Sequence, residues 1–249
     1  MMYQSLLYYA SFVLGLLLAV LCSVRVGKKR GLSARDAGLY TAAGFLSGVL
    51  GAALMAQAYN AVLRAVAGPG AFSPSTVSLY GGLLLIPLLM LLPVRRMRAD
   101  YGTVMDTCAA GVYVLLGTAK LGCFAYGCCY GAPCEWGPVN RFTGERAFPV
   151  QLLETAISYA IAALLYRYAT NSLSDKKVGT AYPLGLLLYG AARFCVQFLR
   201  AHEAAAEADL VWFMDFWQVV SCVAVLYGAV WFAALTGRNR TKNAGSVGA

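Results

Sequence analysis

Charged residues are scarce in this chain, and their scarcity argues against a water-soluble fold. Asp, Glu, Lys and Arg make up 12% of the 249 residues, whereas hydrophobic residues make up 60% and the mean hydropathy is +0.63. Long polar stretches are also missing, which leaves no room for a separate soluble domain. The composition predicts a single integral membrane domain over residues 1–249, in which about the last 12 residues form a disordered tail.

Histidine is rare in this chain, and cysteine pairs with the C-x-x-C spacing are missing. His202 is the only histidine, and no C-x-x-C motif occurs, which disfavours a histidine-containing metal site and weakens a role as a thiol oxidoreductase. Cys22 follows Leu21, a residue too large to precede a lipoprotein acceptor cysteine. The first apolar stretch has its positive charges after it, unlike a signal peptide, so we expect it to remain in the mature protein.

Long apolar stretches dominate the rest of the chain. A helix needs about 20 mostly apolar residues to cross a bilayer. We predict an all-α, polytopic membrane protein with about seven transmembrane helices, at residues 5–24, 37–60, 76–94, 103–122, 150–168, 179–199 and 212–235.

The basic residues orient these spans, because cytoplasmic loops collect Lys and Arg. Fourteen of the 20 basic residues fall on one predicted side, in segments 25–35, 95–98, 167–177 and 238–242. This asymmetry places the N-terminus outside and the C-terminus inside. The net charge of +9 is then an orientation signal that also attracts anionic lipid headgroups, and it requires no nucleic-acid partner.

Thirteen residues, 119–131, read A-K-L-G-C-F-A-Y-G-C-C-Y-G and mark the candidate site. They place the cation Lys120, three thiols and three glycines where an apolar helix ends. An ionisable residue at such a point indicates function, and glycines let a backbone approach a ligand closely.

Four cysteines in this region form the pattern C-x4-C-C-x4-C at the external end of the fourth span: Cys123, Cys128, Cys129 and Cys134. An oxidising compartment permits disulfides, so we expect at least one here, with three pairings possible. A zinc site is less favoured, because the spacing is not the paired C-x2-C form, and we expect no metal and no cofactor. The other four cysteines lie in apolar segments, where thiols pack as small hydrophobic groups.

Polar residues inside the spans must face a partner, water or a substrate. Arg193 and Gln197 are four residues apart and share one helix face, which Tyr189 and Arg200 extend in either direction. Arg193 has a structural role if it pairs with Asp106, Glu154 or Asp215. Alternatively, Lys120 and Arg193, both towards the outer half of the membrane, would suit a lipid phosphate.

With these residues, the chain resembles the bacterial prolipoprotein diacylglyceryl transferases over nearly its whole length. Their signature G-R-x-G-N-F-x-N-x-E-x-x-G shares the frame of residues 119–131, keeping Gly122, Phe124 and Gly131. Further landmarks follow in the same order: Tyr8 and Gly15; Gly48, Gly51 and Ala52; Tyr80, Gly81 and Gly82; Asp106; Phe148, Pro149, Gln151 and Glu154; Tyr189 to Arg200; and Gln218 with Ser221.

The resemblance implies an enzyme of the bacterial plasma (inner) membrane. It would move the diacylglyceryl group of phosphatidylglycerol to the lipobox cysteine thiol of a prolipoprotein signal peptide, releasing glycerol phosphate. Its expected catalytic residues are Lys120, Arg193, Cys123, Cys128 and Gln197, with Lys120 and Arg193 as a phosphate clamp. Its expected substrate-binding residues are Tyr8, Tyr80, Gly81, Gly82, Gly122, Gly131, Gln151 and Glu154.

The departures from the family pattern fall on its polar residues. The family arginine is Lys120, its first asparagine is Cys123 and its glutamate is Cys128; Tyr126, Tyr80 and Gln197 replace a second asparagine, a histidine and a later glutamate. Lysine lacks the two-pronged geometry of arginine, and tyrosine is a poor base near neutral pH. A lapsed or repurposed lipid-binding relative and a membrane thiol oxidoreductase therefore remain as alternatives.

Overall fold

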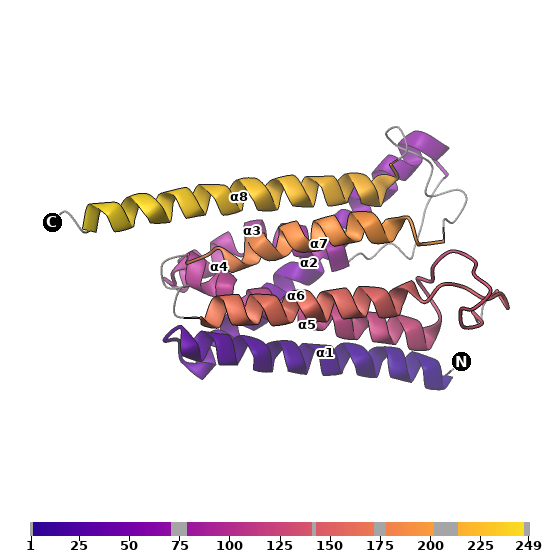
Figure 1. Cartoon of the computed structure of the whole chain (residues 1–249), viewed down its shortest axis with the longest axis horizontal. Coiled ribbons are helices and arrows are strands. Elements are labelled where there is room, and N and C mark those ends of the chain that lie inside the picture. Colours follow the sequence, from indigo (N-terminus) through magenta and orange to yellow (C-terminus); the bar gives the residue numbers. More distant parts are fainter. Residues whose placement is uncertain (1, 71–78, 141–142, 172–177, 202–213, 247–249) are drawn as a thin grey trace.

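The computed structural model describes residues 2–70, 79–140, 143–171, 178–201 and 214–246. Within these ranges the chain is all-α and forms one bundle (Figure 1). Its helices are α1 (Met2–Lys29), α2 (Ala34–Ala67), α3 (Leu79–Leu89), α4 (Leu91–Arg96), α5 (Tyr101–Tyr126), α6 (Val150–Thr170), α7 (Ala181–Gln197) and α8 (Phe216–Ser246).

Helix α5 is the centre of the bundle. It packs against α1, α2, α3, α4, α6 and α7, and its middle turns are buried on most faces. Small residues allow these close approaches: a Cβ on Gly111 would lie 2.8 Å from the carbonyl oxygen of Ala19 in α1. Helices in a bilayer associate through such small-residue contacts.

Apolar side chains cover the outside of the bundle. Leu17 of α1, Leu46 of α2 and Leu226 of α8 are each more than half exposed, which is the reverse of a soluble helix bundle and suits contact with lipid. Among the described residues, α1, α2, α5 and α8 are long and apolar enough to cross a membrane. The chain is therefore a polytopic membrane protein.

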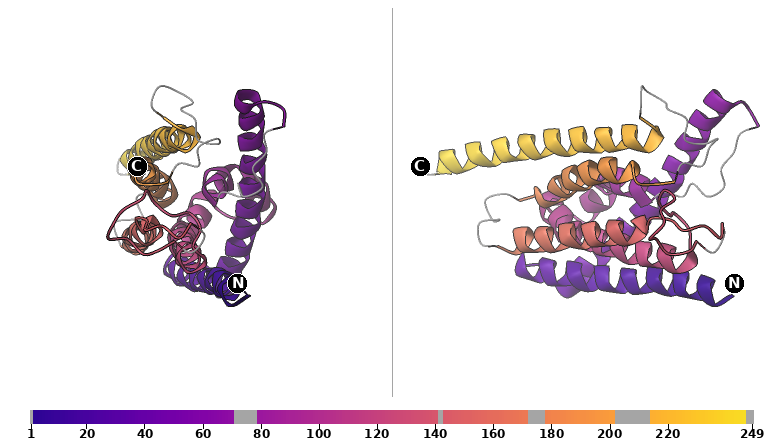
Figure 2. Two further views of the ribbon diagram at one scale, coloured as in Figure 1. Left: turned by 90° about the vertical axis from the view of Figure 1, so that its right-hand side faces the viewer. Right: turned by 45° about the vertical axis from the view of Figure 1, so that its right-hand side comes forward.

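Within the described residues each predicted span overlaps helical structure with different bounds, and the span predicted at 76–94 overlaps two helices, α3 and α4. Three helices are not among the four candidate membrane spans of the described residues. α3 and α7 are short, with 11 and 17 residues, and α6 contains the polar residues Gln151, Glu154 and Arg167. Helix α8 continues to Ser246, into the segment for which the sequence predicts a disordered tail, and residues 247–249 lie outside the described part. α2 crosses the bundle diagonally (Figure 2), and Tyr59 packs on Phe216 and Trp217 at the start of α8.

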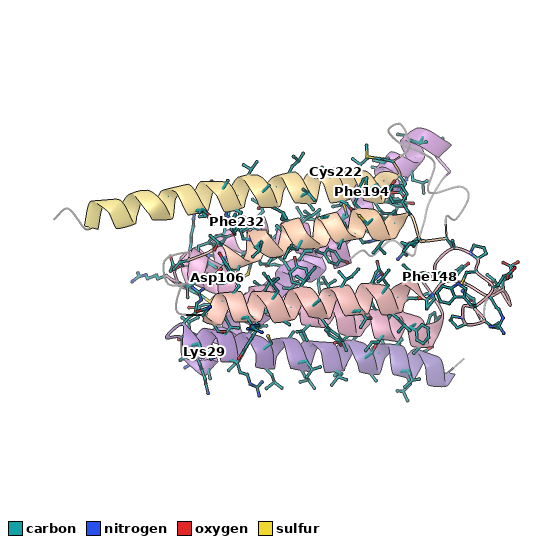
Figure 3. All side chains as sticks on the ribbon, in the orientation of Figure 1. Lys29, Asp106, Phe148, Phe194, Cys222 and Phe232 are labelled. Carbon is teal, nitrogen blue, oxygen red and sulfur yellow. The ribbon has the colours of Figure 1, made fainter. Side chains whose placement is uncertain are left out.

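The bundle has two chemically different ends. The α1–α2 turn, α4 and the C-terminal ends of α6 and α8 lie at one end, here called the basic end (Figure 1). The start of α1, residues 127–140 and residues 143–149 lie at the opposite end, here called the loop end. Figure 3 shows Lys29 and Asp106 at the basic end and Phe148 at the loop end. The described basic segments therefore share one end, as expected; Lys176 and Lys177 lie outside the described residues.

Candidate active site

Glu154 is the centre of a buried charge cluster at the loop end. Its side chain is 2% exposed and lies one turn into α6. Three basic side chains, here called the cation cluster, surround it: Lys120 Nζ is 2.5 Å from Oε2, Arg193 Nε is 3.4 Å from Oε1, and Arg200 Nη1 is 3.5 Å from Oε2. The sequence predicts that Lys120 and Arg193 lie close together, and in the structure both pair with the Glu154 carboxylate.

Three helices and one loop position these charges. Lys120 lies in the penultimate turn of α5, and Arg193 lies near the C-terminal end of α7. Both helices pack against α6, which contributes Glu154. Arg200 follows α7 and is held by an isolated β-bridge to Gly131. A Cβ on Gly131 would lie 2.6 Å from the carbonyl oxygens of Leu199 and Phe148, so only glycine fits at this crossing.

The charge balance favours an anion. Within the described residues, Glu154 is the only carboxylate within ion-pair distance of Lys120 and Arg193, so the pair keeps an excess positive charge even without counting Arg200. Arg193 Nη1 is buried and has no hydrogen-bond partner in the described part of the chain. Buried cations without full compensation are costly unless a ligand completes them.

A long apolar cavity of about 260 Å³ reaches this cluster. It lies between α1, α2, α3 and α5, and its wall runs from Ser23 and Thr41 towards the basic end to Tyr8, Lys120 and Cys123 at the loop end. Lys120 therefore borders both the cavity and the cation cluster. Tyr8 was expected to border a headgroup cavity, and the structure places it on this wall.

Three thiols lie beside Lys120. The Sγ atoms of Cys123, Cys128 and Cys129, here called the thiol cluster, all lie within 4.8 Å of one another. All eight cysteines of the chain are free, so the expected disulfide is absent. The turn after α5 brings three sulfurs together without joining a pair, and Cys134 lies outside the group. Hydrogen bonds from the other two thiols, helped by the Lys120 and Arg200 charges, hold the pKa of Cys129 below its usual range.

The remaining glycines of the predicted site serve mainly helix packing. A Cβ on Gly122 would meet Ser11 of α1, and one on Gly82 would lie 2.6 Å from the carbonyl oxygen of Gly48 in α2. Gly81 faces Met55 in the same way, and Gly82 also lines the long cavity. Tyr80 is buried and packs edge-to-face against Tyr189, with 5.4 Å between the ring centroids. Tyr189 lies one helix turn before Arg193 in α7.

Comparison with known sequences decides the family. A sequence model of the family described as prolipoprotein diacylglyceryl transferase matches residues 3–234. The chain belongs to this family. It is 25% identical over 202 residues to a phosphatidylglycerol–prolipoprotein diacylglyceryl transferase of Clostridium tetani, a match that covers 78% of this chain and 80% of that protein.

Other relatives match over shorter stretches. Transferases of the same name from Teredinibacter turnerae and Bordetella avium are 28% and 31% identical over 166 and 129 residues. These matches cover 63% and 50% of this chain. They cover 55% and 48% of the two relatives, which is about half the length of each. This member of the prolipoprotein diacylglyceryl transferase family is thus a multi-pass membrane protein whose similarity to named transferases is broad but low.

Two predicted site residues of this family member donate side-chain hydrogen bonds to partners outside the cation cluster. Gln197 is fully buried and donates from Nε2 to Asp215 Oδ2 at 2.6 Å, while Asp215 Oδ1 accepts from the backbone of Gln218 at the start of α8. The Gln197 side chain therefore supports a helix cap, and among the described residues no hydrogen bond joins this side chain to a cation-cluster side chain. Gln151 donates to the carbonyl oxygen of Cys128 at 2.7 Å, which ties α6 to the thiol cluster.

Sequence reasoning missed one buried ion pair and undervalued one cation. Arg30, counted among the loop charges that orient the spans, pairs with Asp106 at 3.1 Å at the basic end. Asp106 is therefore no partner of Arg193. Arg200 belongs to the cation cluster. The sequence feature that could have indicated this is its spacing of seven residues from Arg193, which corresponds to two helix turns along the same face.

Proposed function

We propose that this protein transfers the diacylglyceryl group of phosphatidylglycerol to the lipobox cysteine thiol of a prolipoprotein, releasing glycerol phosphate. One observation carries the proposal: Lys120 borders the long apolar cavity and the buried cation cluster at once. A lipid with an acyl chain in the cavity would therefore present its phosphate to Lys120. Family membership supports the same reaction.

The cavity suits an acyl chain in shape and polarity. Its wall is mostly aliphatic and aromatic, and it extends from Tyr8 to Ser23 of α1, a separation of 15 helical steps or roughly 22 Å. Lys120 is the only charged residue on the wall in the described part of the chain, and it lies at one end. This polarity orients a phospholipid with its headgroup at the loop end.

The cation cluster would act on the leaving group. During transfer the acceptor sulfur forms a bond to the glycerol methylene, and the bond from that carbon to the phosphate oxygen breaks with its electron pair on oxygen. Negative charge thus grows on glycerol phosphate. Lys120 and Arg193 would stabilise it by charge-assisted hydrogen bonds. Glu154 holds both cations in place before the lipid arrives.

The loop end should face the outside of the bacterial plasma membrane, where secreted lipoproteins are modified. The described basic segments share the opposite end, which the positive-inside rule assigns to the cytoplasm. We therefore propose seven spans with an external N-terminus, α3, α6 and α7 completing the four clear candidates. Labelling of single cysteines introduced at Lys28 or Lys29 from the external face would overturn this orientation.

The direct test uses the purified protein, phosphatidylglycerol vesicles and a lipobox peptide. We expect a thioether-linked diacylglyceryl peptide by mass spectrometry, and no product from the peptide with serine in place of cysteine. One observation favours a second function, lipid binding without transfer: Glu154 already neutralises Lys120 at 2.5 Å. Saturable phosphatidylglycerol binding without any thioether product would select that second function.

A further inference from the structure

The thiol cluster is built by the way α5 ends. Cys123 lies in the last turn of α5, and Gly127 ends the helix in the left-handed region at φ 94°, so that the backbone N–H groups of Gly127 and Cys128 both donate to the Cys123 carbonyl. Cys129 follows at φ 59°, a conformation that non-glycine residues adopt rarely and that is concentrated at functional sites. This reversal folds Cys128 and Cys129 back towards Cys123.

Three sulfurs at this separation match a thiophilic metal ion. Sulfurs bound at about 2.3 Å to a tetrahedral zinc ion lie about 3.8 Å apart, and the three Sγ atoms already lie within 4.8 Å of one another. Side-chain rotation alone can supply the remaining contraction of roughly 1 Å. Soft thiolate ligands select soft or borderline cations such as zinc. The three cysteines lack the C-x2-C spacing of a paired zinc motif, but the turn at Gly127 brings their sulfur atoms close together in space.

The number of ligands indicates an open site. Structural zinc sites have four protein ligands, whereas catalytic ones have three and keep a position for a substrate. Cys134, the remaining cysteine of this loop, lies outside the cluster. Cys123 also lines the long cavity beside Lys120 and Tyr8. A metal ion held by Cys123 would thus lie where the lipid phosphate and the acceptor thiol must meet.

The reaction needs a means of deprotonating the acceptor thiol. In the described part of the chain, the cavity wall contains no histidine and no carboxylate that could take this proton. Glu154 is engaged by Lys120, Arg193 and Arg200. A thiol that coordinates zinc loses its proton outright, so the thiol cluster can supply what the polar residues here do not.

We propose that Cys123, Cys128 and Cys129 bind one zinc ion whose open fourth position takes the acceptor cysteine as a thiolate. This inference rests on the proposed transferase function. Coordination releases the thiol proton to water. The metal-bound sulfur then donates its electron pair to the glycerol methylene, the carbon–oxygen bond to phosphate breaks, and glycerol phosphate leaves. Zinc changes no oxidation state, and the uncharged thioether product, a weaker ligand, dissociates.

Metal content tests the site without reference to activity. The full-length protein in detergent, dialysed after incubation with zinc, should retain about one zinc per chain by elemental mass spectrometry. Cys123→Ser, Cys128→Ser and Cys129→Ser should each weaken zinc binding at least tenfold, whereas Cys134→Ser, the matched control from the same loop, should not. Cobalt substitution should give thiolate-to-metal charge-transfer absorption in the wild type and in Cys134→Ser only. No retained zinc in the wild type, or equal zinc in the triple serine variant, would overturn the site.

Acceptor binding and transfer test the open position. A lipobox peptide should shift the cobalt absorption, and its serine analogue should not; equal effects of the two peptides would overturn thiol coordination. Removing zinc with a chelator should lower transfer at least tenfold, and adding zinc should restore it. Transfer unchanged by metal removal would overturn the activating role. Stoichiometric zinc without any transfer would support the metal site and overturn the transferase function, so the two failures are distinguishable.

Discussion

Two buried carboxylates stand at opposite ends of the same bundle, and their surroundings differ in charge balance. At the basic end Asp106 accepts from the backbone N–H groups of Gly179 and Ala181 at 2.7 and 2.8 Å, and Arg30 is its only ion-pair partner in the described ranges. At the loop end Glu154 pairs with three cations, and its Oε1 accepts no hydrogen bond from the described residues.

The difference separates a structural ion pair from a binding site. In the part of the chain that the structure describes, each end leaves one buried guanidinium nitrogen without a hydrogen bond, so an unpaired donor alone does not distinguish the two ends. Asp106 balances one cation and joins α1, α5 and the start of α7. Glu154 gathers more positive charge than it can neutralise, and its partner Lys120 lines the long cavity, whose wall includes neither Asp106 nor Arg30. Excess charge beside a cavity is what an anionic ligand requires.

Removing the basic-end carboxylate should have the largest effect on stability. In Asp106→Asn, Arg30 would remain buried without a counter-ion, so we expect a loss of about 3 to 5 kcal/mol in the free energy of unfolding. Denaturant titration in detergent measures it. Asp36→Asn, which changes a surface carboxylate at the same end, is the control. A loss below about 1 kcal/mol would show that the Asp106 ion pair does not stabilise the fold.

Removing the loop-end carboxylate should give a smaller loss that depends on lipid. Glu154→Gln leaves buried cations unpaired and should cost about 2 to 4 kcal/mol in uncharged detergent. Phosphatidylglycerol should recover much of it, because a lipid phosphate can replace the lost carboxylate by binding only the folded state. The measurement compares unfolding with and without this lipid. Equal recovery in Asp106→Asn would erase the proposed distinction between the two ends.

Removing a clamp cation should affect catalysis more than folding. Lys120→Ala and Arg193→Ala each delete a charge-assisted contact to the leaving phosphate, typically worth about 1.5 to 3 kcal/mol, so the transfer rate should fall at least tenfold. Product formation from phosphatidylglycerol and the lipobox peptide gives the rate. Arg64→Ala, an exposed cation near the end of α2, is the control. Rates within a factor of two of wild type for both variants would refute the clamp.

Much of this site follows from the sequence, because its parts obey local rules. The apolar runs predict the helices, and the positions of Lys120 and Arg193 near the ends of such runs predict that their charges meet at one end. The loop thiols also fall together, as Cys123 and Cys128 at the end of α5 suggested. Their oxidation state did not follow, since spacing alone does not fix the distance or geometry of sulfur pairs.

Long-range pairings are what the sequence could not supply. Arg30 has the same local appearance as the loop cations beside it, and only the packing of α1 on α5 buries it against Asp106. Gln197 lies on the face of Arg193 in α7, yet it donates to Asp215 because α8 begins beside it. Choosing among several carboxylates for one cation depends on how helices far apart in sequence pack.

Gly131→Ala should disturb the loop end by a moderate amount. The added Cβ would lie 2.6 Å from two carbonyl oxygens, so the bridge to Arg200 must shift. Overpacking of this kind costs about 1 to 3 kcal/mol. We expect a lower melting temperature together with slower transfer, since Arg200 moves with the loop. Gly144→Ala, in the same loop, places its Cβ in open space at a positive φ of 74°, so it controls for backbone strain without a steric clash. Normal transfer with a clearly lowered melting temperature would remove Arg200 from the site.

The smallest effect should come from the helix cap that begins α5 at the basic end. Asp100 accepts from the backbone N–H of Thr103 at 2.7 Å, so Asp100→Ala should cost about 1 kcal/mol of stability. Lys120 lies 20 residues further along the same helix, roughly 30 Å away, and only fraying of the first turn is expected. Transfer and phosphatidylglycerol binding should therefore stay at wild-type levels while the melting temperature falls by a few degrees. A tenfold loss of transfer in this variant would mean that the two ends of α5 are coupled, and that the basic end does more than hold the bundle together.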